Sequence, residues 1–110
     1  MDKYKVRLTK HAIRQFDNIV DYILNVLQSP TTALNLANAL EHAIQSLELM
    51  PSRTPFVEEE PWHSRKIHKL LVKNYFVYYW IDEYNLKVQV TCICNTRMDQ
   101  AKQLKNMDRT

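Results

Sequence analysis

The spacing of hydrophobic residues changes from strand-like to helical and back along the chain. Residues 4–8 alternate apolar and polar side chains, which predicts a short strand. Apolar residues then recur every three or four positions in two stretches, residues 9–27 and 30–50, which predicts two helices. Further on, β-branched and aromatic runs predict three strands, at residues 65–72, 75–81 and 86–95. A weakly amphipathic stretch from Met98 predicts a short final helix.

The ends of the two long helices carry recognisable signals. Thr9 is a candidate N-cap for the first helix, and Ser29 followed by Pro30 is a typical opening for the second. Pro51 ends the second helix. The connector is so short that the helices are predicted to form an antiparallel hairpin. The two apolar stripes are Ile13, Phe16, Ile19, Val20, Ile23 and Leu27 in the first helix, and Ala33, Leu36, Ala37, Leu40, Ala43, Ile44 and Leu47 in the second.

The strand at residues 75–81 is apolar on both faces. Alternation places Tyr75, Val77, Tyr79 and Ile81 on one face, and Phe76, Tyr78 and Trp80 on the other. We therefore expect a central strand with a neighbour on each side. The order β-α-α-β-β-β with a short C-terminal helix predicts a single α+β domain spanning residues 1–110. In it the helical hairpin packs on one face of a small, mainly antiparallel sheet, and the second face stays open.

The connections are predicted from proline and asparagine. Residues 51–62 contain three prolines and an acidic run, so we expect a linker without compact secondary structure. The chain contains no glycine. Positions with positive φ are therefore assigned to Asn74 and Asn85, because asparagine tolerates this conformation better than most residues.

The net charge of +3 is concentrated in one strip of the chain. Residues 62–75 contain Arg65, Lys66, Lys69 and Lys73, together with His63 and His68, and no acidic residue. Such a strip attracts phosphates or an acidic protein surface, although a solvated, solubilising face fits the charge equally well. No apolar run is long enough to span a membrane, and no secretory signal follows residues 1–5, so we expect a cytoplasmic protein.

Cysteine and histidine provide no metal site. The spacing of Cys92 and Cys94 suits neither zinc nor a relaxed disulfide, so we expect two reduced, partly buried thiols. His11 and His42 are predicted to be surface residues of the helices. We expect no metal and no nucleotide cofactor, because there is no phosphate-binding glycine loop.

Nearly the whole chain resembles the RelE/ParE superfamily of bacterial toxins from type II toxin–antitoxin modules. The resemblance lies in the order and spacing of short motifs. They are Tyr4-Lys5-Val6-Arg7-Leu8-Thr9 before a helix with Ala12 and Phe16, Met50-Pro51 closing the second helix, Arg65, Asn74-Tyr75, Tyr79, Asp82-Glu83, and Asn95-Thr96-Arg97-Met98-Asp99. The resemblance implies one fold with two activities. RelE-like members are ribosome-dependent, metal-independent mRNA endoribonucleases, whereas ParE-like members inhibit DNA gyrase by binding it.

The nuclease residues carry over only in part. The family's lysine on the strand at residues 65–72 corresponds to Lys69, or to Lys66 if the alignment is shifted slightly. The family's arginine at the end of the last strand corresponds to Arg97. Phe76 stands where the family often has an arginine, and Gln103 lies near the place of an aromatic acid/base. For a nuclease, Lys69, Arg97 and His68 are the catalytic candidates, with His63 or His68 replacing the missing proton carrier.

The incomplete nuclease set favours a toxin that binds and poisons DNA gyrase. The mRNA endoribonuclease is the alternative, and an inactive or nucleic-acid-binding relative is a further one. The predicted target-binding residues are Arg65, Lys66, Lys69, Lys73, Phe76, Tyr78, Trp80 and Arg97. We expect Lys69 and Arg97 side by side on the open sheet face. The resemblance also implies a cognate antitoxin with an acidic segment, which docks on the outer side of the first helix and on the open sheet face.

Overall fold

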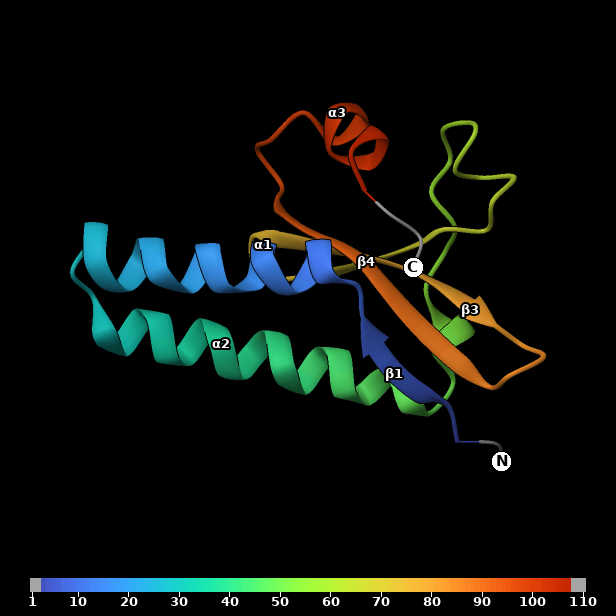
Figure 1. Ribbon diagram of the computed structural model, residues 1–110, viewed down its shortest axis with the longest axis horizontal. Coiled ribbons are helices and arrows are strands. Elements are labelled where there is room, and N and C mark those ends of the chain that lie inside the picture. The colour runs from blue at the N-terminus through green and yellow to red at the C-terminus, as the bar shows by residue number, and fades with distance from the viewer. Residues whose placement is uncertain (1–2, 108–110) are drawn as a thin grey trace.

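The computed structural model describes residues 3–107 and is built on a four-stranded sheet with the order β1-β4-β3-β2 (Figure 1). The strands are β1 (Lys5–Leu8), β2 (His68–Val72), β3 (Tyr75–Asp82) and β4 (Lys87–Asn95). β1 pairs with β4 in parallel, and the other two pairings are antiparallel. β3 has a strand on each side, which confirms the predicted central strand.

Two helices run antiparallel along one face of this sheet (Figure 1). α1 (Lys10–Asp21) continues into the π-helical turn η1 (Tyr22–Val26), and α2 (Pro30–Gln45) into the 3-10 turn η2 (Ser46–Glu48). Thr9 caps α1 as predicted, with its Oγ1 accepting from the Ala12 N–H at 3.1 Å. Pro30 occupies the first turn of α2, but Ser29 forms no side-chain cap in the described chain. The predicted α+β fold is confirmed.

The apolar stripes of the helices form the larger core. Leu36, Leu40, Ile44 and Leu47 from the α2 side pack against the β3 and β4 side chains that point toward the helices. The predicted apolar stripe of the first helix is wrong at both ends, because the side chains there are not buried: Ile13 is 47% exposed and Leu27 is 57% exposed. Figure 1 shows the reason at the far end: the hairpin projects beyond the sheet. The π-helical turn also shifts the rotational phase of the last residues.

The prediction that the second sheet face is open is wrong. Val57, Trp62 and Ile67 from the segment before β2, with Leu104 from α3 (Gln100–Lys105), pack against Tyr78, Cys92 and Cys94. The predicted linker thus has structure, with a 3-10 turn η3 (Pro51–Arg53) and a bridge between Phe56 and His68. Its apolar residues lack a periodic spacing, so the pattern did not reveal that they are buried. Both cysteines are free and fully buried.

Two smaller predictions also need correction. The first meander strand begins at His68 rather than at residue 65, which leaves Arg65 and Lys66 in the turn before it. Positive φ occurs at Lys73 and Leu86, each one position away from the asparagine assignments described above. The strand register fixes where each turn bends, and this constraint outweighs the residue preference.

Candidate functional site

Lys69 lies on β2 in the partly covered region of the second sheet face. Its Nζ lies 4.8 Å from the centre of the Phe76 ring, a cation–π contact. It lines a cavity of about 130 Å³ with Glu59 and Tyr78, and Gln100 and Ala101 of α3 close the other side. Lys69 is therefore half-buried between α3 and the segment before β2.

Arg97 lies where β4 ends, close to the β2–β3 turn. Its neighbour Thr96 donates its N–H to the carbonyl of Asn74 at 2.9 Å, so Arg97 and Lys73 belong to the same end of the sheet. Both side chains are exposed. Lys69 lies four residues before Lys73, about 13 Å away at the usual rise of a strand. The predicted adjacency of Lys69 and Arg97 stays a prediction.

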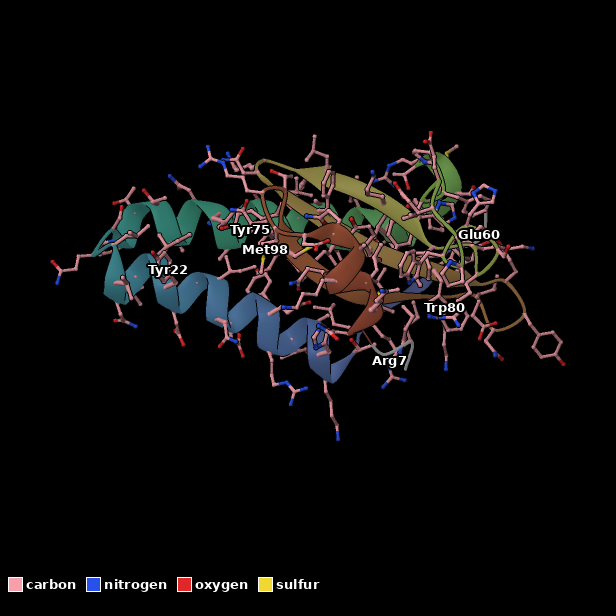
Figure 2. The ribbon with its side chains drawn as sticks, turned by 90° about the horizontal axis from the view of Figure 1, so that it is seen from above. Arg7, Tyr22, Glu60, Tyr75, Trp80 and Met98 are labelled. Atoms are coloured by element: carbon pink, nitrogen blue, oxygen red, sulfur yellow. The ribbon has the colours of Figure 1, made fainter. Side chains whose placement is uncertain are left out.

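A mostly apolar cleft lies at this end of the sheet, and Met98, the residue after Arg97, is part of its lining. It has a volume of about 590 Å³ and lies between α1, the ends of β3 and β4, and α3. Tyr22 and Ile19 line it from the helical hairpin, and Tyr75, Ile93 and Met98 line it from the sheet side. Figure 2 shows Tyr75 and Met98 next to each other and Tyr22 of η1 farther toward the tip of the helical hairpin. We call it the hairpin cleft.

His68 points away from Lys69. Its ring stacks on Tyr79 with centroids 5.0 Å apart, and Tyr79 belongs to the helical side of the sheet. Its Nδ1 is 2.7 Å from the carbonyl oxygen of Thr54. Burial lowers the pKa of the imidazole, although the Thr54 carbonyl and Glu83 oppose the shift. The His68 ring therefore does not lie beside Lys69 on the second face, and its role as a proton carrier stays a prediction.

The remaining predicted residues lie on the second face of β3 and in the turn before β2. Arg65 and Lys66 are exposed in that turn, and Phe76 and Trp80 are half-buried on β3. Tyr78 is only 1% exposed and donates its hydroxyl to Gln100 Oε1 at 2.8 Å, so it offers no free surface to a target. Burial raises the pKa of this hydroxyl, so it stays protonated at neutral pH.

Two glutamines that the sequence reasoning missed hold the site together. Gln100 accepts from Tyr78 and donates to the carbonyls of Asn95 and Met98 at 2.9 and 2.8 Å. Gln15 of α1 accepts the Ile93 N–H at 2.7 Å. β1 pairs with β4 only as far as Val90, so that N–H needs a side-chain acceptor. No sequence signal distinguishes these glutamines from surface glutamines.

One end of the sheet combines exposed basic residues with an apolar cleft. Arg97 and Lys73 are exposed at this end, and the His68 ring lies on the helical side of β2. Within residues 3–107, no three His, Cys, Asp or Glu side chains are grouped to hold a metal ion. The described helices include none that is both long and apolar enough to cross a bilayer.

Comparison with known proteins agrees with this fold. The family described as ParE toxin of the type II toxin–antitoxin system parDE matches residues 6–100. A chain of the chromosomal ParDE toxin–antitoxin system from P. aeruginosa superposes with a TM-score of 0.68 at 17% identity, covering 84% of this chain and 96% of that one. A chain of the RelBE2 toxin–antitoxin complex from Mycobacterium tuberculosis gives 0.62 at 21% identity, covering 86% and 93%. No curated protein sequence matches the chain.

The two structural similarities show a shared fold, and the family match extends from β1 to the first residue of α3. The predicted superfamily is confirmed. The chain belongs to the ParE toxin family of type II toxin–antitoxin systems.

Proposed function

We propose that this toxin stops bacterial growth by binding and poisoning DNA gyrase. The observation that carries the proposal is the separation of two nuclease candidates, because His68 stacks on Tyr79 at the helical side while Lys69 contacts Phe76 on the second face. Residues 98–107 also contain no tyrosine or histidine that could take over proton transfer. A surface that lacks a proton carrier can still bind a target through charge and apolar area.

The proposed contact surface consists of the hairpin cleft and the exposed Arg97 and Lys73 at the same end of the sheet, which we call the basic rim. An apolar groove with basic residues beside it suits a protein partner that presents apolar and acidic side chains. Arginine is enriched among the residues that dominate binding energies at interfaces. We therefore expect Arg97 to contribute more to binding than the other exposed basic residues.

The test is a supercoiling assay with purified gyrase. Wild-type toxin is expected to inhibit at near-stoichiometric concentration, and Arg97→Ala to need about tenfold more protein, the equivalent of about 1.4 kcal/mol. Lys102→Ala is the matched control, because Lys102 is also basic and exposed but lies on α3. Gyrase that keeps full activity in a stoichiometric excess of toxin would count against the proposal.

The alternative is the ribosome-dependent mRNA endoribonuclease. It draws support from Lys69 and Arg97, and from the exposed His63 in the segment before β2. Mapping of mRNA 5′ ends after induction distinguishes the two, because a nuclease leaves new ends within coding regions and a gyrase poison does not. An inactive relative would cause no growth arrest on induction.

We further propose a cognate antitoxin that covers the hairpin cleft and the outer side of α1. Exposed apolar side chains in this region, including Tyr22, Leu24 and Met98, support a protein cover. The basic rim favours an antitoxin segment with several Asp or Glu residues. Co-expression with the product of the neighbouring gene tests this, and a product that does not co-purify with the toxin argues against it.

A further inference from the structure

A second pocket lies at the end of the sheet farthest from the hairpin tip. β2 begins at His68, which pairs with Tyr79, so Trp80 and the residues after it extend past the start of β2. The segment around Thr54 and Phe56 forms the opposite wall. Together they enclose about 530 Å³, and we call this space the His68 pocket. Figure 2 shows Trp80 well apart from Tyr22, Tyr75 and Met98.

A chain of hydrogen bonds fixes the tautomer of His68. Tyr79 donates its hydroxyl to the Pro51 carbonyl at 2.6 Å, so the Thr54 hydroxyl must donate to the Tyr79 oxygen, also at 2.6 Å. The Thr54 carbonyl can only accept, so the His68 Nδ1 carries the hydrogen and donates to it. The Nε2 atom therefore carries the lone pair. The residue is only 5% exposed, and the hydrogen bonds described above all use Nδ1, which leaves Nε2 as the acceptor that His68 brings to the pocket.

The other polar groups of the pocket are also mainly acceptors. The carboxylates of Asp82 and Glu83 line it, with Lys66 as the one basic residue among them. Hydrogen bonds from Asn85 lower the pKa of Asp82, so this carboxylate is charged at neutral pH. Burial keeps the imidazole of His68 neutral, as described above. The pocket thus offers a buried nitrogen acceptor and two carboxylates against a single ammonium.

Two aromatic side chains complete the walls. Phe56, which is exposed, lies 4.5 Å from the His68 ring between centroids, and Trp80 lines the pocket on β3. The faces of such rings attract cations. A group that binds here has to donate hydrogen bonds, carry positive charge and tolerate aromatic contact. The planar guanidinium of arginine meets all three conditions better than an ammonium, because it has several donors in one plane.

We propose that the His68 pocket binds an arginine side chain of a partner protein, with His68 Nε2 accepting one of its N–H groups. Glu83 accepts a second N–H and balances the charge, and Phe56 and Trp80 contact the faces of the guanidinium. A divalent metal is a poor occupant, because the described residues provide no group of three ligands. An anion is also a poor occupant, because two carboxylates face it. The proposal does not depend on gyrase being the target.

The test follows the His68 ring nitrogens by long-range ¹H–¹⁵N NMR spectra of the full chain. The probe is N-acetyl-arginine amide, and the control is N-acetyl-citrulline amide, which has a similar shape without the charge. We expect the arginine probe to shift the His68 Nε2 signal saturably, with a dissociation constant on the order of 1 mM for a single side chain. Citrulline is expected to leave the signal in place at the same concentration.

Two surface variants test the assigned contacts without touching the buried ring. Glu83→Gln is expected to weaken binding about fivefold, because a charge-assisted hydrogen bond becomes neutral. Phe56→Leu is expected to weaken it about twofold, because it keeps an apolar wall but loses the ring face. Glu58→Gln is the matched control, since Glu58 is exposed and lies outside the pocket.

Three results would overturn the proposal. The first is an unchanged His68 signal at about ten times the expected dissociation constant. The second is an equal response to citrulline, which would mean that the pocket does not recognise charge. The third is equal binding by Glu83→Gln and wild type. A shift caused by adenosine monophosphate and not by the arginine probe would assign the pocket to a nucleobase instead.

Discussion

The two faces of the sheet are closed in different ways. The helical face is covered by α1 and α2, whose apolar stripes repeat at helical spacing and meet β3 and β4 over a broad area. The second face is covered by a short helix and an irregular segment, with Val57, Trp62, Ile67 and Leu104 as its main apolar contacts. Side-chain hydrogen bonds also hold this cover in place, since Gln100 of α3 accepts the hydroxyl of Tyr78.

This difference indicates which part of the domain opens only on global unfolding and which part can open locally. A large apolar interface opens only when the whole domain unfolds, whereas a small cover can open locally at a lower free energy. Both proposed binding regions lie at the margins of the second face or of its cover. The hairpin cleft ends at α3, and the His68 pocket is walled by the segment before β2.

The strongest test compares one buried leucine from each face. Leu40→Ala is expected to lower the free energy of unfolding by about 3 kcal/mol, and Leu104→Ala by about 2 kcal/mol, because the smaller cover can relax around the cavity. Urea denaturation measures both. Hydrogen exchange should show loss of protection confined to α3 in Leu104→Ala and spread over the sheet in Leu40→Ala. Global loss of protection in Leu104→Ala would remove the distinction between the faces.

The contribution of hydrogen bonds to the cover of the second face can be tested at Gln100. Gln100→Ala is expected to cost about 2 kcal/mol, because the buried Tyr78 hydroxyl loses its acceptor. Adding Tyr78→Phe to this variant should recover part of the loss in urea denaturation. Gln103→Ala is the control and should stay within about 0.5 kcal/mol of wild type. Equal effects at the two glutamines would mean that the Gln100 contacts do not hold the cover.

The helical face depends also on the start of α1. Thr9→Ala is expected to cost about 1 kcal/mol, because the N–H of Ala12 loses its acceptor. Ser29→Ala should cost only a few tenths of a kcal/mol, since Ser29 bonds Thr32 Oγ1 rather than the helix backbone. Thermal unfolding of the two variants measures the difference. A larger loss in Ser29→Ala would contradict the cap assignment.

The smallest expected effect is a pH dependence from His68. Its pKa in the folded protein lies below the ordinary value of 6.5, so the unfolded chain binds the proton more readily. The contribution of His68 to the free energy of unfolding is therefore complete above the ordinary pKa of 6.5. It is lost as the pH falls below 6.5 and through the lower pKa of the folded protein. His68→Asn keeps a donor for the Thr54 carbonyl and does not titrate, so its urea midpoint should change less between about pH 7 and about pH 5. An identical pH profile for both proteins would exclude this contribution.

The sequence named candidate site residues, but it did not show how they are arranged. The sequence identified Lys69 and Arg97 as candidates through the family resemblance, and it identified the basic character of residues 62–75 directly. Alternation along the predicted strand already places the adjacent residues His68 and Lys69 on opposite faces, but no sequence pattern showed that the His68 ring stacks on Tyr79 at the helical side. The sequence did not reveal the hydrogen-bonding roles of Gln15 and Gln100, because no local pattern separates a solvated glutamine from one that joins two elements by hydrogen bonds.

The sequence by itself determined the elements, their order and the helical face, because periodic apolar spacing and local caps act over a few residues. Only the tertiary structure decided how the second face is closed and which side chains point into each pocket. Those outcomes depend on contacts between residues far apart in the chain, such as Trp62 and Leu104 meeting over Tyr78. No local pattern records such contacts, since each of these residues is buried by distant partners rather than by its own helix or strand.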